Sequence, residues 1–67
     1  MTKSDQTLVY EVLTLMHRDR TISDTYDAAK LVIAHAVKDG HIHPDYQIDW
    51  PRVIGDMADA ETLKTFS

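Results

Sequence analysis

Apolar residues recur at steps of three and four near the start of the chain. With successive residues placed 100° apart on a helix, six of them cover an arc of roughly 160°. These six are Leu8, Val9, Val12, Leu13, Leu15 and Met16. Ser4 is a suitable N-cap, and Asp5 suits the positive end of the helix dipole. The pattern predicts a helix over residues 5–18 whose apolar arc is wider than a surface helix needs.

A second amphipathic segment follows a short link and predicts a helix over about residues 24–39. Its expected apolar face consists of Tyr26, Ala29, Val32, Ile33, Ala36 and Val37. Ser23 or Asp24 can cap its start, and Gly40 suits the left-handed position after its end. Four alanines (Ala28, Ala29, Ala34, Ala36) would permit close approach of another helix. Leu31 falls off the apolar face, and we expect it to be exposed.

Residues 41–49 lack helical periodicity. Pro44 disfavours helical geometry at the residue before it. We therefore expect an irregular connection that Ile42 and Ile48 attach to the core.

Asp49 is a suitable N-cap for a third helix over about residues 50–58, with Pro51 in its first turn. Val53, Ile54, Met57 and Ala58 are expected to form its buried side. Gly55 should weaken it by about 1 kcal/mol relative to alanine. Asp59 is expected to cap a separate final turn, because Glu61 and Lys64 would otherwise fall on the apolar face. Leu63 and Phe66 would fold that turn back onto the core.

These elements predict an all-α fold, a small bundle of three helices with a short C-terminal helical turn, in one domain over residues 1–67. A chain of 67 residues buries only about 60% of the surface that it exposes when unfolded. Cysteine is absent, which excludes disulfides and thiolate metal sites. Helix packing, self-association or a histidine–carboxylate metal site must stabilise the fold.

The negative charge is concentrated in the second half of the chain. The net charge is −4, and residues 39–61 hold six acids (Asp39, Asp45, Asp49, Asp56, Asp59, Glu61) against Arg52 alone. A helix-turn-helix interpretation would place Asp27, Lys30, Leu31, His35 and Lys38 on the recognition helix. Because that face lacks Arg, Asn and Gln, and no basic patch is visible, we do not expect direct nucleic-acid binding.

His41, His43 and Asp45 occupy alternate positions in DGHIHPD. In an extended segment they would share one face, and with His35 they could bind Zn²⁺, Ni²⁺ or Cu²⁺. The segment resembles the His-x-His strand of metal-dependent amidohydrolases, whose large barrel a chain of this length cannot form. The alternative is that the histidines face water. We favour this alternative and expect no metal or other cofactor.

Catalytic chemistry has few candidate residues. The serines lie at predicted helix caps or at the end of the chain, and Gly40 and Gly55 are isolated, so a phosphate-binding glycine loop is absent. We therefore expect a protein that is not an enzyme.

Aromatic and acidic residues lie together in the second half, as they do at many protein interfaces. The candidate partner-binding strip consists of Asp45, Tyr46, Asp49, Trp50, Asp56 and Asp59. It would suit a partner with a basic surface. The alternative, which we favour for Trp50, is a place in the core.

The leading functional hypothesis is a non-catalytic protein that acts through protein–protein interaction. The wide arc of the first helix favours self-association as a homodimer through Val9, Leu13 and Met16. An alternative is an acidic decoy that occupies the nucleic-acid-binding surface of a basic partner. The chain contains no apolar run of membrane-spanning length and does not begin like a signal peptide, so we expect a cytoplasmic location and no membrane contact.

Overall fold

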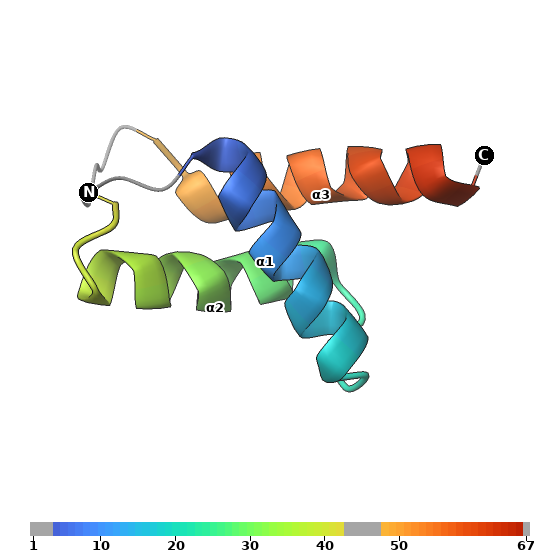
Figure 1. Cartoon of the computed structure of the whole chain (residues 1–67), viewed down its shortest axis with the longest axis horizontal. Helices are drawn as coiled ribbons and strands as arrows, with labels where there is room; N and C mark the ends of the chain where they lie inside the picture. Colours follow the sequence, from blue (N-terminus) through green and yellow to red (C-terminus); the bar gives the residue numbers. More distant parts are fainter. Residues whose placement is uncertain (1–3, 43–47, 67) are drawn as a thin grey trace.

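Three helices form the part of the chain that the computed structural model describes, residues 4–42 and 48–66 with side chains to residue 64. They are α1 (Asp5–Arg18), α2 (Thr25–Lys38) and α3 (Trp50–Phe66). In Figure 1, α2 and α3 lie side by side and run in opposite directions, and α1 crosses both. The predicted all-α three-helix bundle is confirmed.

The wide apolar arc of α1 is explained by its position across the other two helices. Leu8, Val9 and Val12 are buried in the core, and Leu13, Leu15 and Met16 pack against it half-buried. Ser4 caps the helix as predicted, because its hydroxyl accepts a hydrogen bond from the Thr7 N–H at 3.2 Å. The arc is wide because α1 contacts two helices rather than one.

Both ends of α2 carry the signals expected from the sequence. Asp24, not Ser23, is the N-cap, and its carboxylate accepts the Tyr26 N–H at 2.8 Å. Gly40 has a φ of 78° after the last turn. The N–H groups of His41 and Gly40 donate to the carbonyls of Ala36 and Val37 at 2.8 and 3.1 Å. These two bonds form a Schellman motif, which satisfies carbonyls that the helix end leaves open.

Tight packing against α2 uses its small residues. Ala28, Ala29 and Ala36 are buried, as are Val32 and Ile33, whereas Ala34 is exposed. Leu31 is exposed, as predicted.

Tyr26 and Ile48, both expected in the core, lie at the surface. Tyr26 is 38% exposed, and its ring lies 5.1 Å from the Lys30 Nζ atom, so a cation–π contact holds it beside solvent. Ile42 is buried and attaches the connection to the core, but Ile48 is 40% exposed. The prediction that Ile48 also anchors the connection was wrong.

The third helix is longer than the sequence pattern predicted. Asp49 caps it as expected, since its carboxylate accepts the Arg52 N–H at 3.4 Å, but the helix continues through residue 58 to Phe66. Asp59 caps no separate turn. Its carboxylate instead accepts a hydrogen bond from the Thr25 hydroxyl at 2.7 Å.

Beyond residue 58, α3 extends past the other two helices in Figure 1. This end needs no continuous apolar side, and both Glu61 and Lys64 are exposed. Leu63 is 69% exposed, so it does not fold back onto the core. The Phe66 side chain lies outside the described residues.

The buried side of α3 is rotated from the one expected. Ile54 and Ala58 are fully buried, and Met57 is half-buried, but Val53 is 38% exposed. Gly55 is buried in its place. A Cβ atom at Gly55 would lie 3.1 Å from the Tyr26 Cα atom, so the missing side chain lets α3 approach the backbone of α2. This close approach turns Val53 toward solvent.

Candidate protein-interaction surfaces

Four of the six residues of the predicted partner-binding strip lie among the described residues. Asp49, Asp56 and Asp59 are exposed. Trp50 packs half-buried against the core, and its Nε1 atom is shielded from solvent without a hydrogen-bond partner among the described residues. Trp50 therefore lies against the core without being fully buried in it. Asp45 and Tyr46 lie outside the described residues.

A continuous exposed row along α3 and its N-cap residue includes two of these acids. We call it the outer stripe, and it consists of Asp49, Val53, Asp56, Ala60 and Leu63. The steps between its members are four, three, four and three residues, the spacing with which helices pair along one seam. All five are exposed, with Val53 at 38% and Leu63 at 69%. This spacing is present in the sequence. The pattern of apolar residues does not indicate it, because two of the five positions are acidic.

Asp56 lies at the middle of the outer stripe. Within residues 4–42 and 48–66, its carboxylate forms no hydrogen bond or ion pair. Two charged residues flank the stripe. Asp59 accepts a hydrogen bond from the Thr25 hydroxyl, and Arg52 is the base nearest to Asp56 in sequence. The stripe is therefore an apolar row with negative charge at its start and centre.

The residues proposed for self-association contribute mainly to packing within a single chain. Val9 is 6% exposed and belongs to the core of a single chain. Leu13 and Met16 keep part of their surface. A groove of about 300 Å³ runs between α1 and α3 at this place. It is lined by Gln6, Val9, Tyr10, Leu13, Met57 and Glu61.

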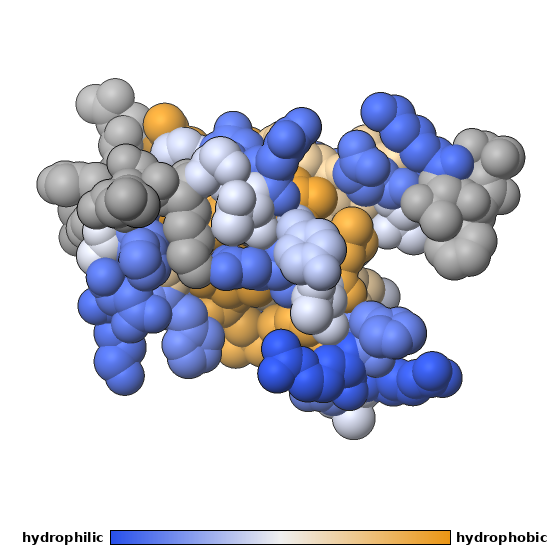
Figure 2. All heavy atoms as spheres, in the orientation of Figure 1, coloured by the Kyte–Doolittle hydropathy of each residue, from blue (hydrophilic) through white to orange (hydrophobic). Residues whose placement is uncertain are grey.

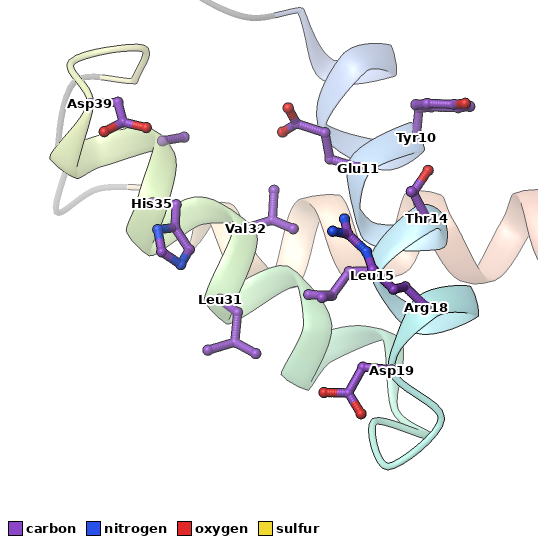
Figure 3. A pocket seen from close by; sticks show the side chains of 11 residues that line it. Tyr10, Glu11, Thr14, Leu15, Arg18, Asp19, Leu31, Val32, His35 and Asp39 are labelled. Carbon is purple, nitrogen blue, oxygen red and sulfur yellow. The ribbon is translucent and has the colours of Figure 1, made fainter.

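A larger groove of about 560 Å³ lies in the angle between α1 and α2. Figure 2 shows hydrophobic atoms at the surface in this angle, with hydrophilic side chains around them. In Figure 3, Leu15 from α1 and Leu31 and Val32 from α2 lie on its apolar side, and Arg18 and Asp19 lie at its edge. The charges at the rim are mixed, so the groove selects neither an acidic nor a basic ligand.

Asp19, at the edge of this groove, has its charge stabilised locally. The Thr21 hydroxyl donates to its carboxylate at 2.6 Å, and the Thr21 N–H donates at 3.1 Å. These two bonds lower the pKa of Asp19 below its ordinary value of 3.8, the hydroxyl having the larger effect. The bonds order the link between α1 and α2.

The predicted metal ligands are only partly described. His41 is half-buried after α2, and His43 and Asp45 lie outside the described residues. His35 lines the groove between α1 and α2. Among the residues with described positions, no three His, Asp or Glu side chains gather as metal ligands would.

The described helices also lack the combination of length and apolar character that crossing a bilayer requires. Comparisons of the chain with protein families, with curated proteins and with solved structures found no match.

Proposed function

We propose that this chain is a non-catalytic interaction protein that binds another protein through the outer stripe of α3. The observation that carries the proposal is the exposure of all five stripe residues at alternating steps of four and three. The C-terminal half of α3 also supports the proposal. A helix in water is stabilised mainly by packing of its apolar face, so a partner that covers this half would stabilise it. That half extends past α1 and α2, and Leu63 lacks a cover within the described part of the chain.

The acidic residues indicate the chemistry of the partner. Asp49 and Asp56 lie in the stripe, and Asp59 lies beside it. A partner surface with apolar groups flanked by lysine or arginine complements this arrangement, and complementary charges raise both specificity and association rate.

Two other proposals remain separable from this one. Homodimerisation through Leu13 and Met16 would use the partly exposed surface of both residues, of which Leu13 lines the groove between α1 and α3, although Val9 is already buried within the chain. An acidic decoy would use the same carboxylates without the apolar residues. Its binding would weaken steeply between roughly 50 and 300 mM salt, because exposed charges are screened over that range.

The test is a pull-down from the native host with two variants as matched baits, quantified by mass spectrometry. Leu63→Glu places a charge in the outer stripe, and Leu31→Glu places the same charge on an exposed leucine of α2. We expect a partner that the wild-type chain and Leu31→Glu retain and that Leu63→Glu loses. Retention that depends on Leu31, or on neither leucine, would contradict the proposal.

A further inference from the structure

The outer stripe has a feature that decides which helix can cover it. Its five positions place Asp56 at the centre, with two residues on each side, and the carboxylate is exposed. In paired helices, a single polar residue in the seam selects the register and the partner at a cost in stability. Asp56 has this place within the helical part of the stripe, since Asp49 precedes α3 as its N-cap.

A second copy of the chain fits this surface poorly. If two stripes paired over their full length in antiparallel orientation, position 56 would face position 56 of the other chain. Parallel pairing gives the same result and also sets Asp49 against Asp49. Like charges placed opposite one another across an interface cost binding free energy, and charge is the usual means of rejecting a wrong partner. Both orientations are therefore disfavoured by the same carboxylate.

A helix with a cation at its central seam position complements the surface. Val53 and Leu63 offer apolar contacts on either side of Asp56, and Ala60 leaves room for a larger side chain of the partner. Arg52 is the nearest base in sequence. No described residue forms an ion pair with Asp56, so its charge can bind a cation on a partner helix.

We infer that Asp56 is the specificity residue of the outer stripe, which excludes a second copy and selects a partner helix with lysine or arginine at its central seam position. The inference rests on the proposed function, because it assumes that the outer stripe binds a helix.

The probes are synthetic amphipathic helical peptides with apolar residues at steps of four and three, and with Lys, Gln or Glu at the central position. Binding is followed by NMR shifts of the Val53, Ala60 and Leu63 amides. At low salt we expect the Lys peptide to bind about tenfold more tightly than the Glu peptide. In the variant Asp56→Lys, the order of the two peptides should reverse.

Asp27→Lys is the matched control, since it makes the same charge change at an exposed acid on α2. It should leave the order of the peptides unchanged. Equal binding of the three peptides to the wild-type chain would overturn the inference and leave the proposed function standing. Absence of binding by all three would count against the proposed function itself. A reversal in Asp27→Lys as large as that in Asp56→Lys would assign the preference to overall charge and overturn the role of Asp56.

Self-association gives a second, independent readout by light scattering. Asp56→Leu removes the repulsion and completes the apolar row, so it should shift the chain toward a dimer, whereas Asp27→Leu should not. An Asp56→Leu chain that stays monomeric up to about 1 mM would overturn the exclusion of a second copy. A wild-type dimer that Leu63→Glu leaves intact and Leu13→Glu abolishes would instead place self-association on α1.

Discussion

At the scale of single residues, Gly55 shows how a local weakness serves a tertiary contact. In an isolated helix, alanine would be more favourable than glycine by about 1 kcal/mol. In the folded chain, a Cβ at this position meets the Tyr26 Cα atom at 3.1 Å and the Tyr26 backbone nitrogen at 3.4 Å. Both neighbours are backbone atoms, so a rotamer change cannot relieve the crowding.

We therefore predict that Gly55→Ala destabilises the protein. Overpacking of a tight contact costs about 1–3 kcal/mol, which outweighs the gain in helix propensity. The free energy of unfolding in urea measures the balance. Ala60→Gly exchanges the same two residue types at an exposed site of the same helix. It therefore measures the difference in helix propensity between alanine and glycine alone. A Gly55→Ala chain that is more stable than wild type would show that α2 and α3 separate at little cost.

At the scale of elements, one hydrogen bond joins the first turn of α2 to the middle of α3. The Thr25 hydroxyl, on a residue that is 7% exposed, donates to the Asp59 carboxylate at 2.7 Å. Asp59 lies one turn of α3 beyond Gly55. Gly55 in turn lies against the backbone of the first turn of α2, the turn that contains Thr25. Together these contacts set the position of α2 along α3.

Removal of this bond should lower stability by about 1 kcal/mol. Thr25→Val keeps the shape of the side chain but lacks the hydroxyl, and Asp59→Ala removes the acceptor. If the bond is responsible, the double variant will lose less than the sum of the two single losses, because each change already breaks the same interaction. Asp56→Ala, on the exposed side of α3, serves as the control. Strict additivity in the cycle would argue against the bond.

The element scale also separates what was predictable in α3 from what was not. Asp49 was identified correctly as its N-cap from side-chain type and position. Its predicted end near residue 58 was wrong, because that prediction required an apolar face along the whole helix, on which Glu61 and Lys64 would fall. The helix runs past the other two, so that requirement ends near residue 58.

At the scale of the whole molecule, the small core limits stability. At about 0.05–0.15 kcal/mol per residue, a domain of 67 residues has a free energy of unfolding of about 3–10 kcal/mol. Three side chains dominate the fully buried volume, namely Leu8, Ile54 and Val12. Burial of each of these side chains therefore contributes a large fraction of the free energy of unfolding.

Leu8→Ala should therefore lower the free energy of unfolding by about 2–5 kcal/mol, a large share of the total. Leu63→Ala is the matched control, since the same atoms are removed from a side chain that is 69% exposed. Its effect should stay within about 0.5 kcal/mol. Thermal unfolding followed by circular dichroism compares the two variants. Similar losses would mean that Leu63 has a cover within the chain and that the outer stripe is not free.

The sequence alone determined the helical class and most helix ends, because these depend on local spacing and capping chemistry. Ser4, Asp24, Gly40 and Asp49 all occupy the cap positions expected of them. Tertiary structure decided which side of α3 is buried and how much of the apolar arc of α1 the other helices cover. The close approach at Gly55 turned Val53 outward, and the crossing of α1 over both partners used most of its apolar arc. Such outcomes depend on distances between segments far apart in the chain, which spacing along one helix does not contain.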